Sequence, residues 1–436
     1  MAASGWLLPD AAPKDRSSTT EQTMDMERKG RYRFPWSRTD NPGAWIEVTD
    51  RCNLVCRGCY RRKLGGDRPL EDIKADIDAC RSMTNCDAIT IAGGEPLIYP
   101  HLSEVIRHIR QRGVKPVLLT NGIGFNPDVA ARLTRAGLAK VHFHVDSGQI
   151  RPGWEGANEL ELNALRQRYA DLCHELRGLQ CGFNSTVYRS TLQYVPAILE
   201  WARANIEKVQ HYSLIAYRAI PLTEGWEYTV NGRRVEPSFI PNTTTDPNEI
   251  SITTREMYDI LAWHFTAFQA SAYLNGSSAP ETDKFLVAVL AGSKNEIYGS
   301  LGSRTVELVQ LFHHLLTGRY CAFLRSPKPG RKLFILSLVD PVLKGAFRRY
   351  RAAVMRNPLR LLDSIYIQSI HFEQPYEIVN GEVNLCDDCT NKMVYGGKLI
   401  PSCRLDEYRV LGGLLTPVPL RGEPRPTSML VGEEDI

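Results

Sequence analysis

The feature that most constrains the fold is a regular alternation of strand-like and helix-like segments between residues 44 and 217. Short runs rich in β-branched and aromatic residues alternate with stretches whose apolar residues recur at helical spacing. The predicted strands cover residues 44–49, 88–92, 116–119, 141–145, 181–187 and 209–215, and the predicted helices cover residues 69–83, 101–111, 128–136, 159–176 and 194–204. Such an alternation favours parallel strands joined by right-handed crossovers. Because it stops near residue 216, we expect an α/β fold with a partial (β/α)6 TIM-like barrel over residues 44–217.

The rest of the chain divides into three segments around this core barrel. Residues 1–43 are polar and lack a sustained period, which predicts a flexible N-terminal arm. Residues 218–383 open with a stretch rich in Pro, Thr and Asn at 220–252, which predicts a lid loop, and continue as a helical, basic region. The helices expected there cover residues 254–274, 283–290 and 305–316. Residues 384–436 form a C-terminal extension with further cysteines.

Three cysteines lie in one loop directly after the first predicted strand. Cys52, Cys56 and Cys59 have the spacing C-x3-C-x2-C. Thiolates ligate iron–sulfur clusters, and compact spacing lets one loop wrap one cluster. Three ligands for a four-iron cube leave one iron open to a substrate or cosubstrate. A zinc knuckle is the alternative, but it usually has a second pair of ligands nearby, and residues 60–79 contain no Cys or His.

Two further motifs follow the next two predicted strands at their carboxyl ends, where α/β folds place their sites. Gly93 and Gly94 begin a GGEP sequence, and glycines let the backbone approach a ligand closely. Glu95 is either a ligand contact or a turn or helix cap. Asn121 lies in a TNG sequence and is either a site residue or part of a turn.

Together, CNLVCRGC, AGGEP and TNG resemble the motifs of the radical S-adenosylmethionine (SAM) superfamily. The resemblance implies that Cys52, Cys56 and Cys59 hold a [4Fe-4S] cluster whose open iron binds the amino and carboxylate groups of SAM. It also implies one-electron cleavage of SAM to a 5′-deoxyadenosyl radical, which takes hydrogen from a substrate C–H. The implied SAM-binding residues are Tyr60, Gly93, Gly94, Glu95, Asn121, Asp146 and Ser185.

Because the cofactor performs the difficult step, we expect few acid–base side chains and assign no catalytic residue. His142 and His144 alternate with apolar residues, so they either point into the barrel or pack as strand residues. The expected partners are a small-molecule or lipid substrate and an electron donor of the reductase, flavodoxin or ferredoxin type.

A second set of cysteines lies in the C-terminal extension. Cys386, Cys389 and Cys403 have the spacing C-x2-C-x13-C, and Cys321 is the candidate for a fourth ligand. We interpret the set as an auxiliary iron–sulfur cluster or a mononuclear iron, since auxiliary clusters are common in the enzymes that the chain resembles. The alternative is a structural zinc ribbon. Eleven cysteines without a signal peptide indicate a reducing compartment, and we expect a cytoplasmic protein.

Residues 308–362 hold eleven Lys or Arg and a single acid, Asp340. Within this segment residues 342–355 form an amphipathic pattern beside the apolar run 333–339, which is typical of a peripheral membrane contact. The alternative is an ordinary surface helix packed on the barrel. Nucleic acid is not an expected partner, because the net charge of the whole chain is only +4.

Three functions compete. The first is a radical SAM enzyme acting on a lipid or isoprenoid at a membrane surface. It is favoured by the basic segment, by the similarity of residues 52–121 to adenosylhopane synthase, and by tail cysteines similar to those of tetraether lipid synthases. The second is a peptide-modifying maturase, whose auxiliary-cluster domains the tail cysteines resemble. The third is an iron–sulfur electron carrier, which has no use for a SAM-binding motif.

Overall fold

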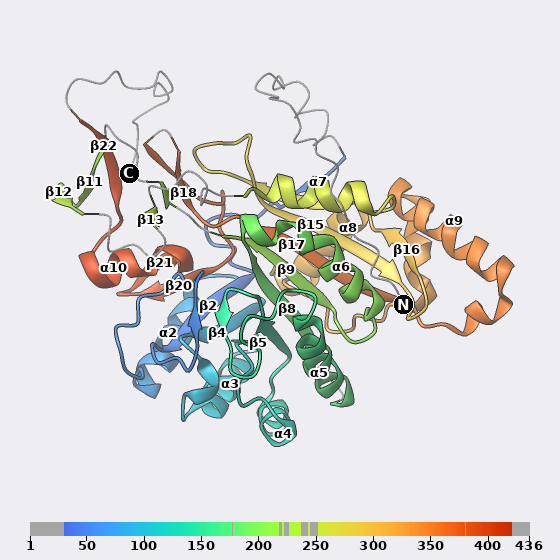
Figure 1. Cartoon of the computed structure of the whole chain (residues 1–436), viewed down its shortest axis with the longest axis horizontal. Helices are drawn as coiled ribbons and strands as arrows, with labels where there is room; N and C mark the ends of the chain where they lie inside the picture. The colour runs from blue at the N-terminus through green and yellow to red at the C-terminus, as the bar shows by residue number, and fades with distance from the viewer. Residues whose placement is uncertain are drawn as a thin grey trace.

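The computed structural model describes residues 30–176, 178–217, 220–221, 226–236, 243–244, 252–379 and 381–420. Its main element is one 11-stranded sheet with the order β1-β14-β15-β17-β9-β8-β6-β5-β4-β2, and β16 pairs with β15 (Figure 1). The predicted barrel strands are β2 (Gly43–Thr49), β4 (Ala88–Gly93), β5 (Lys115–Thr120), β6 (Lys140–His144), β8 (Gln180–Val187) and β9 (His211–Ala216). Neighbouring members of this set all pair in parallel, which confirms the predicted α/β class.

The predicted crossover helices are also present. They are α2 (Leu70–Met83), α3 (Leu102–Gln111), α4 (Pro127–Ala136), α5 (Leu162–Glu175) and α6 (Val195–Ala204). Local signals explain their ends, as in α4, where the Asn126 side chain accepts a hydrogen bond from the N–H of Val129 and Gly137 ends the helix with a positive φ. The helices lie along one side of the parallel strands (Figure 1). Strand residues such as Ile91, Leu118 and Phe143 are buried in the core that the helices cover.

The sheet continues beyond the six predicted strands. β17 (Tyr366–Glu373) pairs in parallel with β9, and β15 (Asp283–Gly292) pairs antiparallel with β17. β14 (Ala272–Asn275), β16 (Ile297–Ser300) and β1 (Tyr32–Arg33) complete the sheet. The helix expected at residues 283–290 is therefore wrong. Phe285, Val287 and Val289 alternate along one face of β15, and bulky or branched side chains at a period of two fit a strand.

Two other expectations need correction. The helix expected over residues 254–274 is shorter, because α7 (Thr254–His264) ends before β14 begins. The flexible arm expected over residues 1–43 contains a packed part, since β1 joins the sheet and the side chains of Phe34 and Trp36 are buried. Residues 1–29 lie outside the described residues.

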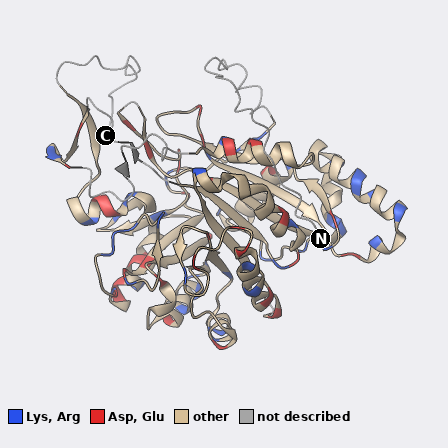
Figure 2. Ribbon diagram, viewed as in Figure 1, with Lys and Arg blue, Asp and Glu red and all other residues tan. Residues whose placement is uncertain are grey.

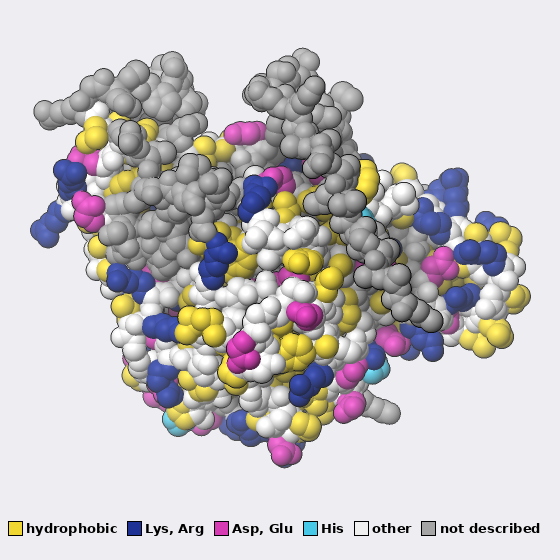
Figure 3. Space-filling view, viewed as in Figure 1, with side chains coloured by type: hydrophobic (Ala, Val, Ile, Leu, Met, Phe, Trp, Pro, Cys, Tyr) yellow, Lys and Arg dark blue, Asp and Glu magenta, His cyan; other side chains and the backbone are white. Residues whose placement is uncertain are grey.

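The basic segment folds against the edge formed by β16. It comprises α8 (Ser303–Thr317), η5 (Gly330–Leu338), α9 (Pro341–Arg356) and η6 (Pro358–Leu362), so the expected helices at 305–316 and 342–355 are confirmed. The Asp340 carboxylate caps α9 by accepting hydrogen bonds from the N–H groups of Val342 and Leu343. α9 projects at one end of the molecule, where basic side chains lie beside hydrophobic ones (Figures 2 and 3).

The C-terminal extension is built from small sheets. β11 (Trp226–Val230) pairs with both β12 (Arg233–Val235) and β22 (Thr416–Pro419), so this part of the expected lid is a strand pair joined to the tail. The other short strands are β10 (Ile220–Pro221), β13 (Thr243–Thr244), β18 (Glu377–Val379), β19 (Glu382–Asn384), β20 (Lys392–Tyr395) and β21 (Lys398–Pro401), with η7 (Ser402–Arg404) and α10 (Leu405–Leu411) after them. The remainder of the lid at 220–252 lies outside the described residues. No described helix has the length and apolar character that crossing a bilayer requires.

Candidate active site

A cavity of about 420 Å³ lies on the inner face of the sheet. Side chains at alternate positions of the strands point into it, because successive residues of a strand face opposite sides of a sheet. The barrel strands contribute Trp45, Thr90, Val117, Leu119, His142, His144, Asn184, Thr186, His211 and Ser213, and the added strands contribute Phe285, Val287, Val289, Ser369, His371 and Glu373. Gly58 and Tyr60 of the first cysteine loop line the same cavity. Of the two alternatives for His142 and His144, the structure favours the inward one, because both side chains line the cavity.

The first cysteine loop is held by backbone pairing. β3 (Val55–Cys56) pairs antiparallel with β7 (Gln149–Ile150), the segment that follows β6, and the N–H of Arg57 donates to the carbonyl of Gly148 over 2.8 Å. The structure brings the three thiols together, since Cys52 and Cys59 are among the charged neighbours that act on Cys56. Burial raises the pKa of the Cys56 thiol to about 12, with Asp146 and the two other thiols adding to the effect. Binding of a metal to this thiol therefore releases a proton.

Gly93 and Gly94 are required by close packing against the backbone that leads into this loop. A side chain on Gly94 would place its Cβ 2.1 Å from the carbonyl oxygen of Arg51, and one on Gly93 would lie 2.3 Å from that of Thr49. The N–H of Gly94 donates to the Thr49 carbonyl over 2.7 Å. The structure thus supplies a reason for both glycines that is separate from ligand approach.

Glu95 joins the second motif to the third. Its buried carboxylate accepts hydrogen bonds from the Thr120 hydroxyl at 2.6 Å and the Asn121 N–H at 2.7 Å. It also accepts from the N–H of Leu97 at 2.8 Å and so caps the short helix η1 (Pro96–Ile98), which confirms the capping alternative. The Asn121 amide in turn donates to the Asn53 side chain in the cysteine loop over 2.8 Å. The three sequence motifs therefore form one hydrogen-bonded unit.

The side chains of Asp146 and Ser185 have different surroundings. The Asp146 carboxylate is buried, lies 2.8 Å from His144 Nε2 and accepts from the N–H of Gly148. Burial acts to raise the pKa of Asp146, but the hydrogen bond and charge of His144 outweigh it and the pKa is lowered. Ser185 points toward the helices, where its hydroxyl donates to the Val145 carbonyl over 2.6 Å. Ser185 does not line the cavity, whereas its neighbours Asn184 and Thr186 do, because successive residues of a strand face opposite sides of the sheet.

Arg61 was not predicted as a site residue, yet it connects the cysteine loop to the C-terminal extension. Its buried guanidinium donates to the Glu47 carboxylate on β2 and to the carbonyl of Ser402, both over 2.5 Å. It also lies 4.6 Å from the ring centre of Tyr60, so Tyr60 is held between the loop and the tail. The partners of Arg61 are far apart in sequence, and no local pattern signals this role.

Cys386, Cys389 and Cys403 line the same cavity as the first loop. Burial raises the pKa of Cys386 well above its usual range, and the charges of Cys389 and Cys403 raise it further. Cys321 does not join them. It lies near Asp87 and His313 beside the amino ends of β4 and β5, and the structure does not support it as the fourth ligand.

Part of the chain matches a known protein family. Residues 46–202 match the model of the Radical SAM superfamily. They form a radical SAM domain. The thiol donors of Cys52, Cys56 and Cys59 fit the [4Fe-4S] cluster of that family, and Gly58 and Tyr60 of the same loop line the adjoining cavity.

The relatives of the radical SAM domain are diverse. Fe-coproporphyrin III synthase of Methanosarcina barkeri is 26% identical over 201 residues, which are 44% of this chain and 48% of the relative. 7,8-Dihydro-6-hydroxymethylpterin dimethyltransferase of Methanocaldococcus jannaschii is 29% identical over 230 residues, which are 49% of this chain and 44% of the relative. The chain thus spans about half the length of these curated relatives.

Among solved structures, Streptococcus suis SuiB bound to S-adenosylmethionine matches with a TM-score of 0.37 and 13% identity over 52% of this chain and 48% of SuiB.

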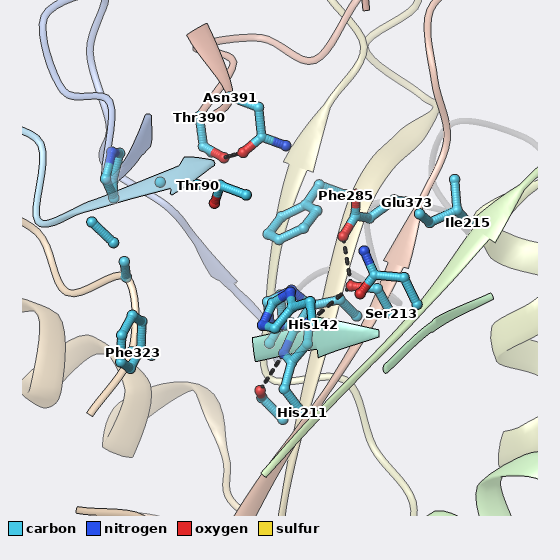
Figure 4. Close-up of a pocket in the computed structure, with 18 of the residues that line it drawn as sticks. Thr90, His142, His211, Ser213, Ile215, Phe285, Phe323, Glu373, Thr390 and Asn391 are labelled. Carbon is cyan, nitrogen blue, oxygen red and sulfur yellow. Dashed lines mark hydrogen bonds between the residues drawn. The ribbon is translucent and has the colours of Figure 1, made fainter. Parts of the chain in front are cut away.

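A hydrogen-bonded row of polar side chains lies on the cavity wall, along the paired strands β9 and β17 (Figure 4). The two ring nitrogens of His211 lie 2.9 Å from the hydroxyls of Ser369 and Ser213, and Ser213 donates to the Glu373 carboxylate over 2.7 Å. The ring of His142 stacks on His211 at 4.5 Å. Burial lowers the pKa of His211 well below its usual range, so the imidazole is neutral. A neutral ring that donates at one nitrogen and accepts at the other can pass a proton along this row.

Proposed function

We propose that the chain is a radical SAM enzyme that abstracts hydrogen from a C–H bond of a lipid or isoprenoid substrate. The observation that carries the proposal is one cavity that is lined by Gly58 and Tyr60 of the first cysteine loop and has mostly apolar walls and a few converging polar groups. When bound, the cluster and SAM supply a 5′-deoxyadenosyl radical, after an electron arrives from a reductase, flavodoxin- or ferredoxin-type donor.

The chain's own residues position these groups and exclude water. Cys52, Cys56 and Cys59 would hold the cluster, and Asn121, whose N–H donates to Glu95, donates its amide to Asn53 of the loop. Apolar side chains along β2 and β15 keep the reacting centre dry, which protects a radical from side reactions. The polar row that ends at Glu373 offers a place for the polar end of a substrate whose remainder is hydrocarbon.

A peptide-modifying enzyme is the second candidate, because the tail cysteines line the substrate cavity. In this function they would hold an auxiliary iron–sulfur cluster or a mononuclear iron facing the substrate. PqqA peptide cyclase of Xanthomonas axonopodis pv. citri, 28% identical over 179 residues, is a relative whose name gives a peptide substrate. The aligned part is 37% of this chain and 45% of that protein.

The enzyme assignment is tested by anaerobic reconstitution with iron and sulfide. We expect SAM to be cleaved to 5′-deoxyadenosine under a low-potential reductant, and the Cys56→Ala variant to lose this activity and about four irons. Cys86→Ala, which removes a buried thiol of the core, is the matched control and should keep both. A wild-type chain with a full cluster that leaves SAM intact would contradict the proposal.

The tail site is tested by counting iron in the Cys386→Ala/Cys389→Ala variant. Iron should fall toward about four per chain while SAM cleavage persists, because the first cluster remains. Equal iron content in the variant and the wild type would rule out an auxiliary iron site. Zinc bound in the wild type and lost in the variant would identify a zinc ribbon.

The substrate class is tested by isotope transfer. With perdeuterated total lipid extract as substrate, deuterium should appear in 5′-deoxyadenosine, because the abstracted atom is carried by that product. Transfer from deuterated peptides and none from lipids would favour the second candidate.

A further inference from the structure

Hydrophobic side chains are exposed on η5, α9 and η6, at the projecting end of the molecule. Leu338 is 86% and Leu362 is 82% exposed, although both belong to well-formed helical turns. We define the apolar tip as Ile335, Leu338, Val339, Met355, Leu359 and Leu362, all of which are exposed. Arg331 of η5 donates to the carbonyl of Leu361 in η6 over 2.7 Å, so the two short helices lie side by side.

The tip is separate from the hydrophobic core beneath it. The buried face of α9 consists of Leu343, Ala346, Tyr350 and Ala353, and it packs with Leu333 and Phe334 of η5. The rings of Phe334 and Tyr350 stack at 4.9 Å. The core of this unit is thus already filled, and the exposed residues lie outside it, with Leu338 before the start of α9 and Leu362 beyond its end.

The charges around the tip are almost all positive. Asp340, the single acid of residues 308–362, is buried and accepts hydrogen bonds from N–H groups, including that of Gly302. Two acids from neighbouring segments are paired with cations: Arg356 with Glu296 at 3.2 Å and Arg360 with Asp363 at 3.2 Å. Within the part of the chain that the structure describes, the exposed side chains of Lys332, Lys344 and Arg348 take part in no ion pair. Figure 3 shows basic and hydrophobic side chains together at this end, and Figure 2 marks the Lys and Arg positions on the ribbon there.

We propose that the apolar tip docks on the surface of an anionic lipid bilayer. Aliphatic side chains with surrounding Lys and Arg match the boundary between acyl chains and headgroups, where hydrocarbon is buried and cations meet phosphate. A nucleic acid would use the cations and leave the exposed leucines in water. The docking goes beyond the proposed radical chemistry, because it rests on a surface that shares no residue with the cavity.

The test is co-sedimentation of the full-length chain with vesicles. The lipid concentration at which half of the protein sediments with the vesicles should be lower for vesicles containing about 30% phosphatidylglycerol than for pure phosphatidylcholine. Added salt should weaken the binding. The Leu338→Ser/Leu362→Ser and Lys344→Gln/Arg348→Gln variants should each need about tenfold more lipid. All four residues are exposed, so these variants should fold normally.

The matched control is Leu160→Ser/Trp263→Ser, which removes two exposed apolar side chains elsewhere and should bind as the wild type does. Equal binding to neutral and anionic vesicles, or unchanged binding by the Leu338→Ser/Leu362→Ser variant, would overturn the proposal. So would conversion of a dimer to a monomer by that variant without lipid, since the tip would then be a contact between two copies. SAM cleavage, measured in buffer without vesicles, reports separately on the radical chemistry.

Discussion

At the scale of single residues, the position of Gly94 leaves no room for a side chain. Its missing Cβ would lie 2.1 Å from the Arg51 carbonyl oxygen, one residue before Cys52. Alanine there must push the GGEP loop and the cysteine loop apart. The packing that both loops share makes the geometry of the thiols depend on this glycine.

We expect Gly94→Ala to lower the free energy of unfolding by about 1–3 kcal/mol, the usual cost of overpacking, and to reduce iron content. Urea denaturation and iron analysis after reconstitution measure the two effects. Gly345→Ala is the control, because Gly345 lies inside α9 with space around it and alanine is the better helix former. Wild-type stability and iron content in Gly94→Ala would show that the loops accommodate the methyl group.

At the scale of elements, Arg61 connects three parts of the fold that are distant in sequence. Its guanidinium contacts β2 through Glu47, the turn of η7 through Ser402, and Asp406 of α10 at 3.8 Å. Both ends of the Arg61–Glu47 pair are buried, with side chains 6% and 5% exposed. The C-terminal extension is therefore attached to the barrel by a charge network and not by apolar packing alone.

Arg61→Met should destabilise the protein by about 3–5 kcal/mol, because Glu47 would remain as a buried charge without its partner and Asp406 would keep only Arg409 as a cation. Hydrogen exchange should rise first in residues 386–411, which the arginine holds against the barrel. Arg255→Met removes an exposed pair with Asp259 and should cost less than about 1 kcal/mol. Unchanged protection from hydrogen exchange across residues 386–411 of Arg61→Met would mean that other contacts suffice to hold the tail against the barrel strands.

Sequence patterns predicted the elements of the radical SAM domain well, because each strand and helix there has a strong local period. They failed at residues 283–290, where an apolar run fits either a helix or a buried strand and only pairing with β17 decides. Ser185 was assigned only by resemblance, and in the structure its hydroxyl donates to the Val145 carbonyl, because a shift of one residue reverses the face of a strand. Arg61 and the row from Ser369 to Glu373 could not be predicted, since their partners are joined only by the tertiary fold.

At the scale of the whole molecule, three neutral histidines inside the cavity make stability depend on pH. Burial lowers the pKa of His371 to about 3 and those of His142 and His211 well below the usual value. Between these values and about 6.5 the unfolded chain binds more protons than the folded one. The contribution of these neutral histidines to the free energy of unfolding is therefore fully present above about pH 6.5 and is lost as the pH falls below it.

Each of these histidines should contribute up to about 1.4 kcal/mol of lost stability per pH unit below about 6.5. Denaturant midpoints at pH 7.5 and 5.5 measure the slope, and His371→Gln should flatten it. The exposed His101 serves as the control, so His101→Gln should keep the wild-type slope. An unchanged slope in His371→Gln would indicate that its imidazole already titrates normally in the folded chain.

The two walls of the cavity come from different stretches of the chain. β2 to β9 carry the cysteine loop and the SAM motifs, whereas β14, β15 and β17 form the facing part of the wall and lie outside the matched domain. Under the proposed function, mutations in the second group would reshape the substrate chamber while the half that carries the first cysteine loop stays intact. Evolution could then change the substrate without rebuilding the radical chemistry, and an engineer seeking a new specificity should diversify Phe285, Val287 and Val289 first.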